Sequence, residues 1–241
     1  MEFGFEVLWQ TPSDISYEEF GTIIGSDERF EVTKRYRTTT CDLLKTRLGA
    51  DRVVAWNHHI RRSAVTPETE PDHPSSTLPA TRAHVDQSDN RAREAISSEL
   101  GFKTSEELQA WVSRGGRATM INLWRPLKGP VRYAPLTVCD GRSVRPTELV
   151  RCNDYFGEHF SVGYHESQRW YYISDQMPSE PILILCYDSA VDPVLNAKID
   201  ELHRASCCPH TAALSPENTD VTDTRESIEV RTYAFWDPPT R

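Results

Sequence analysis

The sequence predicts a mainly β protein with flanking helices, built as a sandwich or barrel. Short apolar runs separated by turns rich in Gly, Pro and Asp recur through the second half of the chain. One helical insertion interrupts them, whereas a regular alternation of strands and helices would indicate a parallel sheet. We find no internal repeat and no second domain, so we expect a single domain over residues 1–241.

The first 80 residues are predicted to contain two strands, a short helix and a long loop. Strands are expected over residues 3–10 and 51–60, with a short helix over residues 17–24 between them. Four prolines among serines and threonines then predict an extended loop over residues 64–80.

A helical insertion is expected over residues 90–115. Its first part has apolar residues four apart, and Thr104 with Glu107 forms a capping-box pattern that opens a second helix. Beyond it, the apolar runs predict strands over residues 118–124, 136–139, 159–162, 170–174, 181–187 and 226–236, with an acidic loop over 213–224.

Composition excludes several classes of protein. The 241 residues carry a formal charge of −9 without a concentrated basic face, which argues against nucleic-acid binding. The longest apolar run, Ile182–Cys186, is too short to span a membrane, and no leader-like start is recognisable, so we expect a cytoplasmic protein. We expect reduced thiols at all six cysteines, at positions 41, 139, 152, 186, 207 and 208. The motifs of dinucleotide enzymes, P-loop kinases, α/β-hydrolases and zincins are missing.

His84 and Asp86 form the sharpest local feature. On an extended strand, residues two apart point to the same side, so both side chains can reach one ion. A distant histidine would complete a two-histidine, one-carboxylate set, which leaves open positions on iron(II). His210 is the best third ligand, because the competing His203 falls in a helix-like stretch. The alternative is a surface histidine that happens to lie near an aspartate.

A charged row occupies one face of the last expected strand. Arg225, Ser227, Glu229 and Arg231 alternate with apolar residues. One interpretation is a strand that faces solvent. The other is that Arg225 makes a bidentate pair with a dicarboxylate, with Ser227 donating a second hydrogen bond.

The ordered set HxD, distant His and Arg-x-Ser resembles the iron(II)/2-oxoglutarate-dependent oxygenase superfamily. More narrowly, the chain resembles the fungal AsaB-type hydroxylase/desaturase family, which includes gibberellin desaturase and cephem-methoxylase-like proteins. The resemblance spans most of the chain and is carried by Trp56–Arg61, His84–Ser88, Ile121–Leu127, Trp170–Tyr172, Cys186–Ser189, Pro209–Ala212 and Arg225–Arg231.

The resemblance implies a double-stranded β-helix core, jelly-roll and cupin-like, with His84, Asp86 and His210 holding Fe(II) at its open mouth. It implies 2-oxoglutarate as co-substrate, with its far carboxylate on Arg225, and O₂ as oxidant. It also implies a co-substrate contact from Asn122. Two departures are noted: a shorter N-terminus, and a longer stretch before Arg225. The second leaves Arg231 as another candidate for the far carboxylate.

The expected function is therefore oxidation of a small molecule in fungal secondary metabolism, by hydroxylation, desaturation or ring formation. Two alternatives from other classes are a catalytically silent jelly-roll binding protein and a cupin-type metal-dependent lyase or isomerase. No nucleic-acid or membrane partner is expected. The oligomeric state stays open, with a homodimer as one option.

Overall fold

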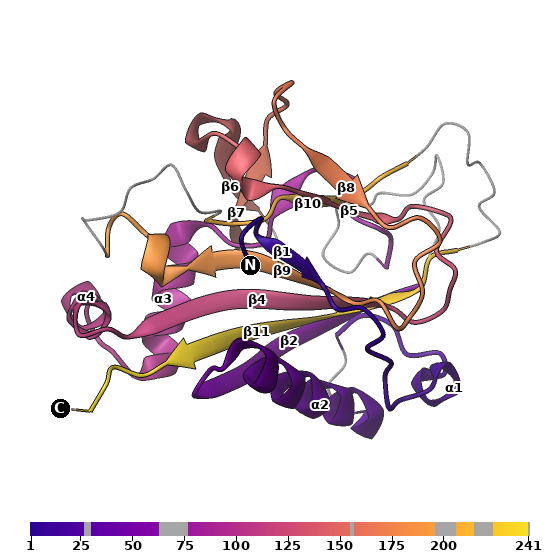
Figure 1. The fold of residues 1–241 in the computed structure, drawn as a ribbon, viewed down its shortest axis with the longest axis horizontal. Coiled ribbons are helices and arrows are strands. Elements are labelled where there is room, and N and C mark those ends of the chain that lie inside the picture. Colours follow the sequence, from indigo (N-terminus) through magenta and orange to yellow (C-terminus); the bar gives the residue numbers. More distant parts are fainter. Residues whose placement is uncertain (27–29, 63–76, 155–156, 196–205, 215–223, 241) are drawn as a thin grey trace.

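Two antiparallel sheets face each other in the computed structural model, which describes residues 1–26, 30–62, 77–154, 157–195, 206–214 and 224–240 (Figure 1). Sheet A has the order β1 (Phe5–Val7), β9 (Ile182–Asp188), β4 (Arg117–Pro126), β11 (Ser227–Trp236), β2 (Arg52–Arg61). Sheet B has the order β6 (Leu149–Asp154), β7 (Gly157–Val162), β3 (His84–Val85), β10 (His210–Ala212), β5 (Leu136–Cys139), β8 (Trp170–Tyr172). This is a jelly roll, and the expected fold class is confirmed.

Four α-helices flank the sheets in the described residues: α1 (Tyr17–Phe20), α2 (Glu31–Leu48), α3 (Asp89–Leu100) and α4 (Ser105–Ser113). Three short 3₁₀ turns cover Gly141–Ser143, Pro146–Glu148 and Ser189–Val191. The capping box of Thr104 and Glu107 at the start of α4 is present as expected. None of the described helices is both long and apolar enough to cross a membrane.

Helix α2 lies along the outer face of sheet A and was not expected from the sequence (Figure 1). Its buried positions are Thr33, Tyr36, Thr40 and Leu44, which follow the helical spacing of three and four. Two of the four are threonines, so the periodicity is hidden when only apolar residues are counted. The edge strand β6 was also missed, because most of its side chains are exposed or half-buried.

The faces of β11 separate two environments. Ile228 and Val230 point outward into the apolar cluster beneath α2. The inward side chains are polar at the start of the strand, at Ser227, Glu229 and Arg231, and apolar further on. The space between the sheets is therefore an apolar core at one end and a polar chamber at the other.

A β-bulge in β2 shapes this chamber. Asn57 pairs with Arg231 and Ala55 pairs with Thr232, so Trp56 is the extra residue on its strand. Because a bulge lets two successive residues face one side, Trp56 and Asn57 both turn inward. Trp56 accordingly packs against the core between the sheets.

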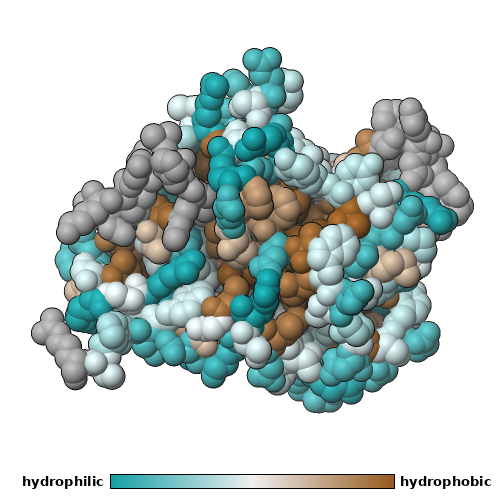
Figure 2. Space-filling view, viewed as in Figure 1, coloured by the Kyte–Doolittle hydropathy of each residue, from teal (hydrophilic) through white to brown (hydrophobic). Residues whose placement is uncertain are grey.

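Aromatic contacts join the edges of the two sheets at the side away from β2. Phe5 of β1 lies 6.0 Å from Tyr171 of β8, measured between ring centroids. Apolar residues gather in the middle of this face of the molecule (Figure 2). Tyr171 and Tyr172 are 47% and 60% exposed and do not line the cavity beside the polar chamber. The aromatic run Trp170–Tyr172 thus serves as an edge strand.

Candidate metal centre

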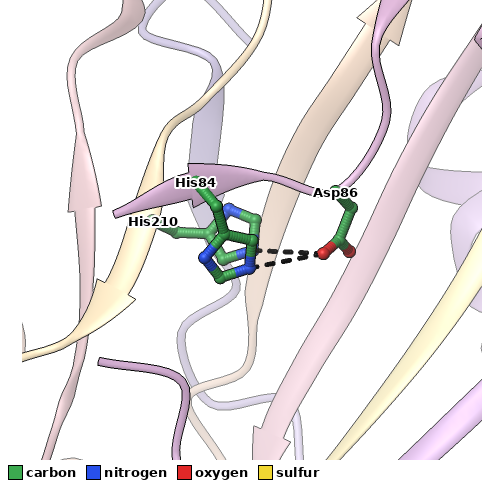
Figure 3. Close-up of side chains that lie close together, drawn as sticks. All are labelled: His84, Asp86 and His210. Atoms are coloured by element: carbon green, nitrogen blue, oxygen red, sulfur yellow. Dashed lines mark ion pairs between the residues drawn. The ribbon is translucent and has the colours of Figure 1, made fainter. Parts of the chain in front are cut away.

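His84, Asp86 and His210 converge in the polar chamber, as the sequence predicts (Figure 3). His84 of β3 and His210 of β10 stand directly opposite each other in the ladder, and Asp86 follows β3 by one residue. Oδ1 of Asp86 lies 3.4 Å from Nε2 of His84 and 3.9 Å from Nε2 of His210. Two ligands that bind one divalent ion at about 2.1 Å are at most about 4.2 Å apart, so these atoms can share an ion.

The hydrogen bonds of the two imidazoles fix which nitrogens are available. Nδ1 of His84 lies 2.8 Å from the carbonyl oxygen of Arg82, and Nδ1 of His210 lies 3.1 Å from that of Cys208. A carbonyl oxygen only accepts, so each Nδ1 must donate its proton. The Nε2 lone pairs are therefore free to bind a metal, and both point toward Asp86 (Figure 3).

Charges around the cluster keep Asp86 ionised. Burial raises the pKa of Asp86, but the charge of Arg231 and the contacts with both histidines outweigh burial and hold it well below its usual value. For His84, burial lowers the pKa, yet the hydrogen bond and charge of Asp86 raise it overall. Burial and the nearby His84 lower the pKa of His210.

The second carboxylate oxygen of Asp86 is held by the protein. Asn122 donates from Nδ2 to Oδ2 of Asp86 at 2.5 Å, and Arg231 donates from Nε to the same atom at 3.1 Å. Glu229 accepts from both donors, from Asn122 at 2.8 Å and from Arg231 at 3.3 Å. Asn122 and Arg231 were expected to contact the co-substrate, which stays a prediction, and in this structure both contact Asp86.

Arg225 lies in a different setting, two residues before β11 begins. Its guanidinium is buried, donates from Nη1 to the carbonyl oxygen of Ala134 at 2.7 Å and lies 5.3 Å from the ring centre of Trp124. Among the described residues, no carboxylate pairs with it and its Nε has no hydrogen-bond partner. Burial and the charge of Arg61 lower the pKa of Arg225 to about 9.

Two hollows that share part of their lining border the cluster. A narrow pocket of about 30 Å³ is lined by Arg225, Trp124, Thr211 and both histidines. A larger cavity of about 250 Å³ lies beside Asp86 and His84 and is lined by residues of β2, α3 and β7. Ser227 is buried at the start of β11, on the face of the strand that carries Glu229.

Several residues of the site were not singled out from the sequence. Trp124 could have been found, because it lies two residues beyond Asn122 on the same strand face. Asn57, His59 and Arg61 line the larger cavity and belong to a block that carried the family resemblance. Arg91 and His159 gave no signal, because their place depends on contacts between distant elements.

Two histidines and one carboxylate on a jelly roll define the class of mononuclear non-haem iron oxygenases. A family model described as "Oxidoreductase/YMDC permease-like domain" matches residues 2–235. The hydroxylase/desaturase efuI of Hormonema carpetanum is 30% identical over 235 residues, which cover 87% of this chain and 72% of efuI. The hydroxylase/desaturase asaB of Aspergillus flavus is 35% identical over 139 residues, which cover 50% of this chain and 56% of asaB.

The fold has a close match among solved structures. A single-residue variant of the iron and alpha-ketoglutarate-dependent endoperoxidase NvfI superimposes with a TM-score of 0.74 at 26% identity, covering 98% of this chain and 77% of NvfI. The chain belongs to the fungal hydroxylase/desaturase family of iron(II)/2-oxoglutarate-dependent dioxygenases, as its motifs predicted.

Proposed function

We propose that this chain is an iron(II)/2-oxoglutarate-dependent oxygenase that oxidises a small molecule, and that His84, Asp86 and His210 hold the iron. The convergence of two Nε2 atoms and one carboxylate oxygen carries the proposal. Two imidazoles and a carboxylate suit iron(II), and three ligands leave positions for a co-substrate and oxygen. The bound iron, with 2-oxoglutarate and O₂, supplies the oxidant that removes hydrogen from the substrate.

Arg225 is the residue that we assign to the far carboxylate of 2-oxoglutarate. Its buried cation has one backbone partner and an unused Nε, and it lies in the same pocket as His84 and His210. A carboxylate would supply the missing counter-charge in a fork-to-fork geometry. The pocket is narrow, at about 30 Å³, so binding requires the side chains around Arg225 to move apart. Ser227 stays a candidate for a second hydrogen bond.

Asn122, Arg231 and Glu229 act as positioning residues in this proposal. Asn122 and Arg231 hold Oδ2 of Asp86, while Oδ1 faces the histidines and also accepts a longer hydrogen bond from Nη2 of Arg231 at 3.4 Å. Glu229 fixes both donors in turn. Such outer contacts orient ligands and raise metal affinity. Arg231 is therefore a weaker candidate for the co-substrate than Arg225, because it already pairs with two carboxylates.

We base the remaining assignments, which concern the domain, the substrate and the location of the protein, on membership of this family. We propose a single oxygenase domain over residues 1–241, acting in secondary metabolism on a substrate in the larger cavity. The outcome is hydroxylation, desaturation or ring formation, since each begins with removal of a hydrogen. A cytoplasmic location is supported by the six cysteines, none of which forms a disulfide.

An anaerobic titration tests the proposal. Iron(II) and 2-oxoglutarate added to the purified protein should produce a weak visible charge-transfer band. We expect the band to be lost in His84→Ala and in His210→Ala, and to persist in His165→Ala, a histidine outside the cluster. A native protein without the band, or a band that survives both cluster substitutions, would refute the assignment.

A further inference from the structure

The side-chain amide of Gln87 lines the larger cavity and has no partner in the described part of the protein. Gln87 directly follows Asp86 and is 5% exposed, so the fold leaves it little contact with bulk water. Its amide makes no hydrogen bond to any described residue, and its atoms border the cavity rather than being sealed inside the wall. Buried amides normally have hydrogen-bond partners. The unused amide of Gln87 therefore indicates a ligand.

Asn57 offers a second unused amide on the opposite sheet. Asn57 of β2 and Asn122 of β4 both lie directly opposite Arg231 of β11, one on each side. Nδ2 of Asn122 donates to Asp86 at 2.5 Å and to Glu229 at 2.8 Å. Oδ1 of Asn57 accepts from the backbone nitrogen of the next residue at 2.7 Å, but its Nδ2 donates to no described residue. The protein thus uses one of two similarly placed amides and leaves the donor of the other on the cavity wall.

The charged groups of this wall already interact within the protein. Each of its four arginines has a partner, at positions 61, 82, 91 and 231. Nδ1 of His159 lies 3.0 Å from the carbonyl oxygen of Gly157 and 3.6 Å from Oδ1 of Asp154, and both of these oxygens accept. Nδ1 therefore carries the proton, and Nε2 of the neutral ring presents a lone pair, which would repel an anion. The arrangement favours a neutral occupant.

We propose that Gln87 and Asn57 bind a neutral carbonyl group of the substrate, that of a ketone, lactone or amide. This inference rests on the proposed function, since it names the class of substrate for that site. A carbonyl oxygen accepts two hydrogen bonds, one from each amide. Asp86 and His84 line the same cavity, so the carbon atoms next to the anchored group would lie beside the metal cluster. Neither amide borders the narrow pocket of Arg225, so this site is separate from that of the co-substrate.

Three probes of one shape test the inference. 4-Phenyl-2-butanone carries the neutral carbonyl, 2-methyl-4-phenyl-1-butene has a methylene group in place of its oxygen, and 3-phenylpropanoate has a charged oxygen in place of its methyl group. The full chain is saturated with 2-oxoglutarate and with Mn(II) in place of iron(II), and binding is measured from the paramagnetic broadening of each probe's NMR signals. We expect the ketone to bind about tenfold more tightly than the carboxylate, because a buried charge without a counter-charge is costly.

Two substitutions remove the amides without changing any charge. In Gln87→Leu and in Asn57→Leu, the affinity of the ketone relative to the alkene should fall by roughly two- to tenfold, the contribution of one neutral hydrogen bond. Gln109→Leu, at an exposed glutamine of α4 outside the cavity, is the control and should leave this ratio unchanged. Gln87→Leu should melt no lower than the native protein without probe, because the protein loses no hydrogen bond of its own.

Several outcomes would overturn the inference. These are a native protein that binds none of the probes or binds the carboxylate as tightly as the ketone, and a ratio of ketone to alkene affinity that survives both cavity substitutions. A much lower melting temperature in Gln87→Leu would show that its amide is structural, and loss of 2-oxoglutarate binding would place it at the co-substrate. Failure of the proposed function looks different: the native protein would bind neither the metal nor 2-oxoglutarate, while saturation-transfer NMR of metal-free protein would still show the ratio falling in Gln87→Leu.

Discussion

Arg225 and Arg231 lie six residues apart at the start of the last strand, and their surroundings differ sharply. Arg231 contacts two carboxylates, those of Asp86 and Glu229. Arg225 contacts a backbone carbonyl and an aromatic face, and it forms no ion pair with a carboxylate of the described residues, although the charge of Glu229 acts on it from further away. The protein therefore supplies the counter-charges of Arg231 itself, whereas Arg225 has no ion-pair partner among the described residues.

The pKa shifts of the two arginines run in opposite directions for this reason. At Arg225, burial and the like charge of Arg61 outweigh the opposing charge of Glu229 and lower the pKa to about 9. At Arg231, burial also lowers the pKa, but the charges of Asp86 and Glu229 outweigh it and raise the pKa overall. A buried charge without an ion-pair partner is costly, so the structure is consistent with an anionic ligand at Arg225. A buried arginine that pairs with carboxylates of the protein, such as Arg231, positions its neighbours. A buried arginine without such a pair, such as Arg225, indicates that a ligand supplies the counter-charge.

Replacing Arg225 should have the largest effect. In Arg225→Met, the dissociation constant of 2-oxoglutarate for the iron-loaded protein should rise by about 100- to 1000-fold, because a buried charge-assisted pair is lost. Anaerobic calorimetry measures this change. Arg132→Met, at an exposed arginine paired with Asp175, is the control and should bind normally. If Arg225→Met bound 2-oxoglutarate as tightly as the native protein, the assignment of Arg225 to the co-substrate would be wrong.

The co-substrate should also stabilise the fold through Arg225. At about 100 times its dissociation constant, 2-oxoglutarate should add about 2.7 kcal/mol to the free energy of unfolding, a rise in Tm of about 5–10 °C. Differential scanning calorimetry of the iron-loaded protein measures it. Arg225→Met should lose this rise, yet melt no lower than native protein without ligand, since an unpaired buried charge is removed. A ligand-free Arg225→Met that melts much lower would show that Arg225 is structural.

A substitution at Asn122 tests the positioning role that we assign to the residues around Asp86. Asn122→Leu removes a hydrogen bond to Oδ2 of Asp86, so iron affinity should fall by about 10- to 100-fold. Binding of 2-oxoglutarate at saturating iron should change by less than about threefold. Thr119→Val on the same strand is the control, because this buried hydroxyl has no hydrogen-bond partner among the described residues. A selective loss of 2-oxoglutarate binding would instead make Asn122 a co-substrate contact.

Lowering the pH should weaken iron binding without changing the binding of 2-oxoglutarate at Arg225. This is the smallest of the predicted effects. Iron requires neutral imidazoles, and the pKa of His84 is raised above 6.5, because the hydrogen bond and charge of Asp86 outweigh burial. Iron affinity should therefore fall as the pH drops through that pKa, by up to about tenfold per pH unit for one displaced proton. Arg225 keeps its charge over the same range, so binding of 2-oxoglutarate to protein saturated with iron should stay constant between about pH 6 and 8. Iron affinity that does not depend on pH would contradict this.

Local patterns predicted much of the metal cluster and most of the strands. The spacing of His84 and Asp86 was enough to place them side by side, because strand geometry is regular. Helix α2 was missed, since Thr33 and Thr40 occupy buried positions that usually carry apolar residues. The predicted loops over residues 64–80 and 213–224, and His203, lie largely or wholly outside the described residues.

The roles of several site residues could not be predicted from the sequence, because they depend on contacts between distant elements. Arg225 and Arg231 look equivalent as alternate residues of one strand, and only the position of Asp86 separates them. Asn122 has the polarity expected of a co-substrate ligand, but its neighbours Asp86 and Glu229 come from two other segments. Gln87 follows a strand of sheet B and Asn57 lies in sheet A, so no local pattern brings their side chains to one cavity.

A crystal structure of the anaerobic complex with iron(II) and 2-oxoglutarate would test the account most directly. It should show the iron bonded to Nε2 of His84, Nε2 of His210 and Oδ1 of Asp86, with the far carboxylate of 2-oxoglutarate paired to Arg225. A far carboxylate on Arg231, or an iron bound away from these three residues, would contradict it.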